Sequence, residues 1–140
     1  MIVENAVYPK AEQFQALIGH NDGKPIVMLN LLKFKEKAAY ADGRKTDLTG
    51  QQAYMLYGQE MSPFVESNGG KFIWMGKVEA LAIGIVGAGQ ADLWDVAALM
   101  QYPSAEAFMK IATHPKVQEI GVHREAGLAG QLLILCKSGG

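Results

Sequence analysis

The 140-residue sequence is poor in cysteine, with Cys136 as its single example, so an internal disulfide bond cannot form. Proteins without disulfide bonds suit a reducing compartment, and we therefore expect a cytoplasmic protein. An excess of charge of one sign is also missing, because 13 lysine and arginine residues are offset by 14 aspartate and glutamate residues. Binding to a nucleic-acid backbone depends on clustered positive charge, so we expect no nucleic-acid partner.

Long apolar runs are equally scarce. None approaches the ~20 residues that a helix needs to cross a bilayer, and the first ten residues, which include Glu4, lack the apolar stretch of a signal peptide. Metal-ligand spacings are missing too, since Pro115 separates His114 from His123 and no second cysteine is available. We therefore expect neither a membrane partner nor a metal site.

A nucleotide site is not expected either. Residues 84–92, GIVGAGQAD, superficially resemble a dinucleotide-binding fingerprint, but Asp92 stands at the third glycine position. A strand is predicted to follow, whereas a bound phosphate needs a helix N-terminus at that point. We interpret the segment as a hairpin loop, and the sequence predicts no cofactor.

The elements that are present follow a regular order. Residues 35–47 are polar and predict an exposed loop, and Pro63 is expected to kink or restart the helix that contains it. Apolar periodicity and turn residues predict a short helix at 9–19, a strand at 25–34, a helix at 49–68, strands at 71–84 and 93–102, a helix from Ser104 that is interrupted at His114-Pro115 and resumes towards Gly127, and a strand at 131–137.

Residues 1–140 thus predict one α+β domain, with an N-terminal helical extension at 1–24 and a core at 25–137 in the order β-α-β-β-α-β. This order is typical of the ferredoxin-like fold, in which both main helices cover one face of a four-stranded antiparallel sheet. The other face should then be polar, but strand 25–34 is apolar on both sides and carries Val27, Leu29 and Leu31 on the second one. Because an uncovered apolar sheet is sticky in water, we expect a second copy of the chain to cover it in a two-fold homodimer.

Three stretches carry a resemblance to a known family: MLNLLKF at 28–34, NGGKFIWMGKVEAL at 68–81, and YPSAEAFMKIATHPKVQEIGVHREAGLAGQLLI at 102–134. Together they resemble the domain-of-unknown-function family 1330, in the dimeric α/β-barrel superfamily. The resemblance implies a homodimer whose two sheets form a dimeric α/β barrel. Relatives in that superfamily include cofactor-free monooxygenases, haem-dependent enzymes and muconolactone isomerases, and no residue set in this sequence selects among them.

Polar and aromatic residues inside apolar elements mark a candidate site. Asn30 interrupts the first strand, Tyr57 lies on the following helix and Trp74 lies within the next strand, so these three are candidate ligand-binding residues. The candidate catalytic residues are His123, as a general acid or base, and Arg124, whose guanidinium suits a carboxylate or enolate oxygen. In a ferredoxin-like domain these elements would converge on the layer between sheet and helices.

Three functions stay open from these residues, and the third is haem binding, which would need one of the three histidines as an axial ligand. The first is a dimeric protein that binds or transforms a small organic molecule, aromatic or carboxylate, without metal or nucleotide. If it is an enzyme, cofactor-independent oxygenation or isomerisation is favoured by fold analogy alone. The second is a non-catalytic dimeric module with a self-filled core, in which Asn30 and Trp74 pack structurally. Arg124 would then pair with one of the carboxylates Glu79, Glu119 or Asp95.

Overall fold

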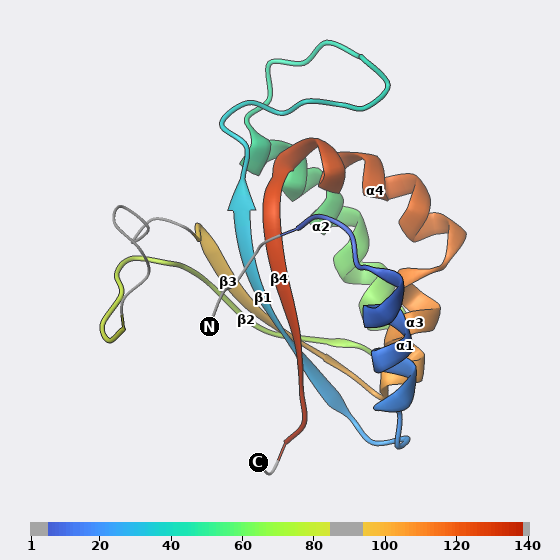
Figure 1. Cartoon of the computed structure of the whole chain (residues 1–140). Coiled ribbons are helices and arrows are strands. Elements are labelled where there is room, and N and C mark those ends of the chain that lie inside the picture. Colours follow the sequence, from blue (N-terminus) through green and yellow to red (C-terminus); the bar gives the residue numbers. More distant parts are fainter. Residues whose placement is uncertain (1–5, 85–93, 139–140) are drawn as a thin grey trace.

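The structure, a computed structural model, describes residues 6–84 and 94–138 (Figure 1). Its helices are α1 (Ala11–Gly19), α2 (Gly50–Ser67), α3 (Ala105–Ala112) and α4 (Pro115–Gly127). Its strands are β1 (Ile26–Phe34), β2 (Lys71–Lys77), β3 (Val96–Tyr102) and β4 (Leu128–Cys136). No helix within these ranges is long and apolar enough to cross a membrane.

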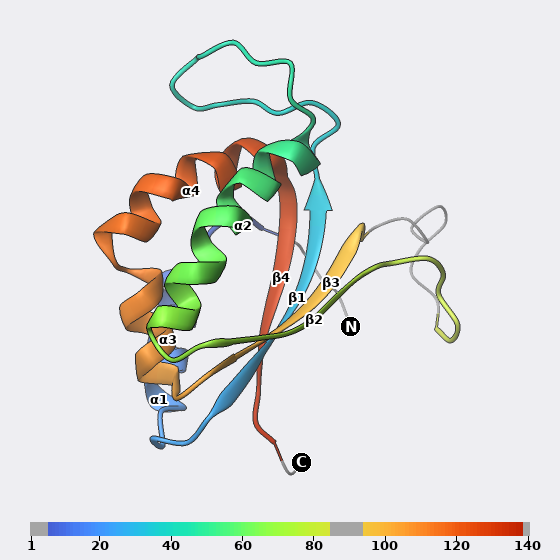
Figure 2. The ribbon, with the colours of Figure 1, turned by 180° about the vertical axis from the view of Figure 1, so that it is seen from behind.

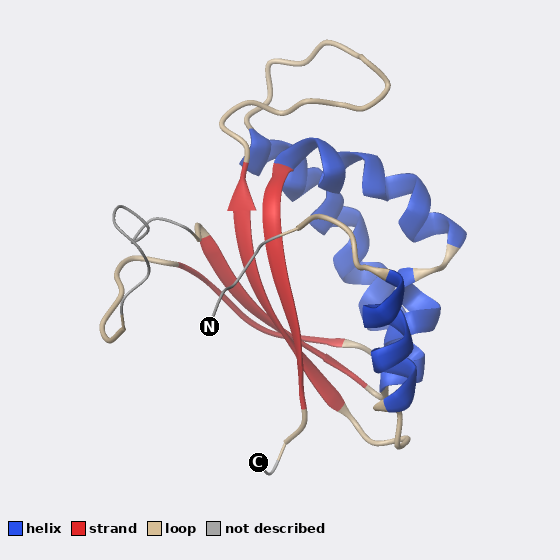
Figure 3. Cartoon of the chain, in the orientation of Figure 1, coloured by secondary structure: helices blue, strands red, loops and turns tan. Residues whose placement is uncertain are grey.

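The four strands form one antiparallel sheet in the order β2-β3-β1-β4. The helices lie together on one side of this sheet (Figure 3), with α2 packed along α4 (Figure 2) and α1 beside α3. This topology is that of the ferredoxin-like fold, so the predicted fold class is confirmed, including the additional N-terminal helix α1.

The core fills the layer between the sheet and the helices, and alternate positions of each strand supply it. In β1 the side chains of Ile26, Met28 and Leu32 are almost fully buried, as the period of two in a strand requires. Val65 of α2 and Leu128 at the start of β4 are buried against them. Burial of such side chains is the main favourable contribution to folding.

Short polar side chains fix where two of the helices begin. Thr49 Oγ1 accepts a hydrogen bond from the backbone N–H of Gln52 at 3.1 Å, and Ser104 Oγ accepts one from the N–H of Ala107 at 3.0 Å. Ser104 is thus the N-cap of α3, which confirms the predicted start of this helix. Helix α2 continues through Pro63 to its end at Ser67.

One predicted strand is too long. β2 ends at Lys77 and not at Gly84, because its partner β3 begins only at Val96. Just beyond the paired strands, the Val78 N–H donates to the Asp95 carbonyl at 2.9 Å. The expected hairpin loop at 84–92 lies, from residue 85 onward, outside the described residues.

The face of the sheet opposite the helices is apolar and partly exposed. Directly opposed residues of antiparallel strands point to the same face. The register therefore places Trp74, Leu99, Leu29 and Ile134 in one row across all four strands. Trp74 is 53% exposed and Ile134 is 42% exposed. The strand alternation that predicted a second apolar face is thus reproduced in the structure.

Candidate functional site

A chain of side-chain hydrogen bonds crosses the helix-facing side of the sheet near the junction of α4 and β4. Arg124 Nη2 donates to Gln131 Oε1 at 2.6 Å, and Gln131 Nε2 donates to Asn30 Oδ1 at 2.9 Å. Asn30 Nδ2 in turn donates to the Met28 carbonyl at 3.2 Å. The predicted residues Asn30 and Arg124 are therefore connected, through a residue that was not predicted.

Gln131 was missed because strand 131–137 was interpreted as a continuous apolar run. In the sheet Gln131 is opposite Leu32, so its side chain lies on the helix-facing side with those of Leu133 and Leu135. The alternation in β4 could have identified it, since Gln131, Leu133 and Leu135 are spaced two residues apart and therefore point to the same face of the strand. The same signal identified Asn30 in β1.

Arg124 has a second hydrogen bond, to the N-terminal segment. Its Nη2 also donates to the Val7 carbonyl at 2.6 Å, and its guanidinium lies 5.7 Å from the centre of the Tyr8 ring. Within the described residues it forms no ion pair, and its Nε and Nη1 have no hydrogen-bond partner. Asp95, one of the expected carboxylate partners, instead accepts from the Phe34 N–H at 2.8 Å.

Three tyrosines lie in the layer between the sheet and the helices: Tyr54 and Tyr57 on α2, and Tyr102 at the end of β3. The Tyr54 and Tyr57 rings are 5.5 Å apart between centres. Burial raises the pKa of all three hydroxyls above the ordinary tyrosine value, and the Arg124 cation partly offsets this rise in the pKa of Tyr54 and of Tyr57. The opposing effect of Arg124 indicates that its charge acts on both phenols.

The three hydroxyl groups have no hydrogen-bond partner within the described part of the chain. No fully buried side-chain polar atom of the described residues lacks a partner, so each of these hydroxyl oxygens retains contact with solvent. We name Arg124, Tyr54 and Tyr57, with the hydrogen-bonded side chains of Asn30 and Gln131, the tyrosine–arginine cluster. It combines one unpaired cation, open phenol groups and aromatic faces, which together suit an anionic aromatic molecule.

His123 belongs to a different contact. Its Nδ1 lies 2.7 Å from the hydroxyl oxygen of Tyr40, and the two rings meet edge to face. Tyr40 is in the loop that was predicted to be exposed, and this prediction is wrong for Ala38 and Tyr40, which are buried. The Ala39 N–H donates to the Ala126 carbonyl at 3.0 Å, so the loop is held against α4 by both backbone and side chain.

Trp74 lies on the other face of the sheet, in the row that it shares with Leu99. Its indole also covers Gly76, where a Cβ atom would meet the ring. The five predicted residues thus do not surround one site: Asn30, Tyr57 and Arg124 lie in the tyrosine–arginine cluster, His123 contacts the loop, and Trp74 lies behind the sheet.

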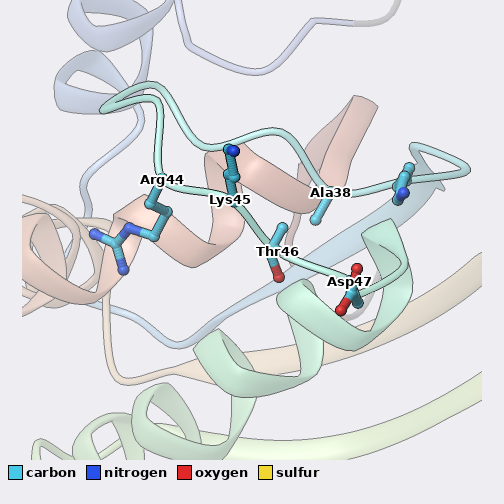
Figure 4. Close-up of a pocket in the computed structure, with 6 residues that line it drawn as sticks. Ala38, Arg44, Lys45, Thr46 and Asp47 are labelled. Carbon is cyan, nitrogen blue, oxygen red and sulfur yellow. The ribbon is translucent and has the colours of Figure 1, made fainter.

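Two surface hollows lie away from the tyrosine–arginine cluster. One is lined by residues of the 37–47 loop, namely Lys37, Ala38, Arg44, Lys45, Thr46 and Asp47 (Figure 4). These side chains diverge, and Arg44 is paired with Asp42. A second hollow lies between α2 and α3, beside Phe64 and His114. The described residues contain no grouping of histidine, cysteine and carboxylate side chains that could hold a metal ion.

Comparison with known proteins identifies two highly similar solved structures. The RPA0582 protein of unknown function from Rhodopseudomonas palustris is 32% identical, with 98% of this chain and 99% of that chain covered and a TM-score of 0.83. The methylated RPA0582 protein gives 35% identity, coverage of 99% and 100%, and the same TM-score of 0.83.

A third solved structure is more distant. A protein from Bacteroides fragilis, described as dimeric, of unknown function and of ferredoxin-like fold, is 12% identical, with 81% of this chain and 95% of that chain covered and a TM-score of 0.47. A likeness at that level carries no argument about this chain. No family model and no curated protein matches the sequence.

Proposed function

Because this chain belongs to the family of the RPA0582 protein of unknown function, we propose a function from its own side chains. The protein is a homodimer that binds a small aromatic carboxylate at the tyrosine–arginine cluster, without a metal or a nucleotide. We also propose that the chain is related to the domain-of-unknown-function family 1330 and to dimeric α/β-barrel proteins, which its sequence resembles. It is limited to binding, and a reaction on the bound molecule would need a proton-transfer group beside it.

The observation that carries the proposal is the unpaired guanidinium of Arg124. A partly buried cation is usually paired with a carboxylate, because removing it from water is costly. Here two guanidinium nitrogens are left without a protein partner in the described chain. A carboxylate is the natural complement, since it can accept a charge-assisted hydrogen bond from Nε or from Nη1. A bidentate pair of parallel bonds would also need Nη2, which donates here to Val7 and Gln131.

The tyrosines support an aromatic ligand. Tyr54 and Tyr57 present neighbouring rings, and aromatic pairs gain stabilisation in tilted and edge-to-face arrangements. Their hydroxyls are protonated at neutral pH and can donate to a carboxylate oxygen, and burial raises their pKa further above the ordinary value. Arg124 would supply the charge and the tyrosines the aromatic surface.

Homodimer formation is supported by the apolar face of the sheet. The positions of β1, β3 and β4 that share this face carry no charge until Lys33 at the end of β1; they are Val27, Leu29, Leu31, Ala97, Leu99, Gln101, Leu132, Ile134 and Cys136. A patch of this kind marks an interaction surface. A second copy in two-fold symmetry presents the same patch and is therefore complementary to it.

A second candidate function is the non-catalytic module with a self-filled interior. It is favoured by Asn30, whose amide is satisfied within the chain by the Met28 carbonyl and by Gln131. On this view the hydrogen-bonded chain to Arg124 only fastens α4 to the sheet. The two functions differ in one measurable respect, because only the first predicts that an added carboxylate binds to Arg124.

The test is a calorimetric titration with benzoate, with phenol and benzamide as neutral analogues. We expect binding of benzoate to the wild-type protein, and a loss of about tenfold or more in affinity in Arg124→Met, since a charge-assisted pair is removed. Arg44→Met is the matched control, because it removes an exposed arginine from the loop and should leave the affinity unchanged. Thermal melts of each variant establish that it is folded.

Equal affinities in the wild-type protein and in Arg124→Met would contradict the proposal, and so would a complete absence of benzoate binding. Arg124→Lys provides a finer comparison. It retains the charge but not the planar fork, so we expect an affinity between those of the wild-type protein and Arg124→Met.

A further inference from the structure

Residues 6–8 lie along the outer edge of β4 and reach across to α4, and we name them the N-terminal strap. Ala6 forms an isolated β-bridge with Gln131: the Gln131 N–H donates to the Ala6 carbonyl at 2.7 Å, and the Ala6 N–H donates to the Gln131 carbonyl at 3.2 Å. At the other end the Tyr8 hydroxyl donates to Glu125 Oε2 at 2.7 Å. The strap therefore joins β4 to the last turn of α4.

Between these two attachments the strap contacts the cation of the candidate site. The Val7 carbonyl oxygen accepts from Arg124 Nη2 at 2.6 Å, and the Tyr8 ring lies beside the same guanidinium. A carbonyl oxygen is a weaker partner for guanidinium than a carboxylate, because it carries only a partial charge. Val7 thus occupies a position at Arg124 that a ligand oxygen would also prefer.

The attachment of the strap is limited. One bridge and two side-chain hydrogen bonds, one of them from Arg124 itself, hold it, and Tyr8 is 58% exposed. Val7 packs in part against the cluster that contains Leu32 and Leu128. Segments with few buried contacts and exposed hydrogen bonds open locally at a small fraction of the global free energy of unfolding.

We infer that the N-terminal strap regulates the carboxylate site by competition, with the Val7 carbonyl taking the place of a ligand oxygen on Arg124 until the strap is released. The inference rests on the proposed function of the tyrosine–arginine cluster. It adds that the ligand and the closed strap exclude each other. The apparent affinity is then the affinity of the open form multiplied by the fraction of molecules in which the strap is open.

The double variant Ala6→Pro/Tyr8→Phe weakens both attachments of the strap. Proline removes the N–H that donates to Gln131, and phenylalanine removes the hydroxyl that donates to Glu125. Gln15→Ala in α1 is the matched control, since Gln15 is exposed and forms none of the strap contacts. The affinity for benzoate and the amide hydrogen exchange of Gln131 are measured in all three proteins.

We expect benzoate to bind the double variant about tenfold more tightly than it binds the wild-type protein or Gln15→Ala. In the wild-type protein, benzoate should accelerate exchange of the Gln131 amide, which is bonded to Ala6, and leave that of Leu29 in the central strand unchanged.

Benzoate binding of equal strength in all three proteins, with no change at the Gln131 amide, would overturn the strap inference and leave the binding site itself intact. Weaker binding in the double variant would also overturn it, because the strap would then complete the site rather than compete for it. Benzoate binding in none of the proteins would overturn the proposed function and the strap together.

Discussion

Gly127, at the end of α4, lies directly against Gly50, at the start of α2. A Cβ atom on Gly50 would be 2.7 Å from the Gly127 carbonyl oxygen, and one on Gly127 would meet the Gly50 carbonyl and lie 2.9 Å from the Tyr54 nitrogen. The two helices can approach this closely only because neither residue has a side chain. The contact sets the spacing of α2 and α4, and hence the position of Tyr54 relative to Arg124.

We predict that Gly127→Ala destabilises the protein. The added methyl group meets backbone atoms, which cannot rotate away, so the helices must separate, and overpacking of this kind costs about 1–3 kcal/mol. Chemical denaturation gives the change in the free energy of unfolding.

Gly121→Ala, in the same helix, is the control. A Cβ atom there meets nothing within 4 Å, so the higher helix propensity of alanine should stabilise the protein by roughly 0.5–1 kcal/mol. Destabilisation of equal size by both substitutions would show that the Gly50–Gly127 contact has no special role.

Trp74→Arg should dissociate the proposed homodimer. Trp74 is 53% exposed in the single chain, so a charge there costs the monomer little, whereas between two sheets it would be buried without a partner. Light scattering on the wild-type protein should give close to twice the chain mass of 15.2 kDa, and on the variant close to the chain mass itself.

Met55→Arg is the matched control for Trp74→Arg, because Met55 is also 53% exposed but lies on α2, away from the sheet face that is opposite the helices. It should remain dimeric. A wild-type protein of one chain mass, or a Trp74→Arg protein that stays dimeric, would contradict an interface on this face of the sheet.

The stability of the protein should decline in alkaline solution. Burial raises the pKa of Tyr54 and Tyr102 in the folded chain, so above the ordinary tyrosine pKa of about 10 the unfolded chain loses these protons first. The stabilisation is complete below that pH and is lost as the pH rises towards the folded pKa values. Each tyrosine contributes a slope of at most about 1.4 kcal/mol per pH unit.

Tyr54→Phe and Tyr102→Phe should each reduce this alkaline slope while leaving the fold intact, since neither hydroxyl has a hydrogen-bond partner in the described chain. Urea denaturation at a series of pH values measures the slope. An unchanged slope in both variants would show that these tyrosines titrate alike in the folded and unfolded chains.

The order of elements was predictable because local patterns determine it. The alternation of Ile26 and Met28 with Val27 and Leu29 identified a strand that is apolar on both sides, and Ser104 identified a helix start. These signals depend on neighbours within a few residues. The end of β2 was not predictable in the same way, because a strand stops where its partner stops, and the partner here begins at Val96.

The composition of the site was only partly predictable, because it depends on register and on segments distant in sequence. Asn30 and Arg124 were identified as polar residues in apolar elements, but Gln131 joins them only through the pairing of β4 with β1. Val7 reaches Arg124 across more than a hundred residues of sequence. Trp74 was grouped with them because a sequence does not state which face of β2 a residue occupies once a bulge intervenes.

The most direct test of the proposed site observes the guanidinium of Arg124 itself. In a nitrogen-labelled protein, the side-chain Nε–H resonance of Arg124 is assigned by its absence in Arg124→Lys, and benzoate is then titrated in. We predict a progressive, saturable shift of this resonance, while that of Arg44 stays in place. A resonance of Arg124 that does not move while benzoate reaches millimolar concentration would contradict a carboxylate site at this residue.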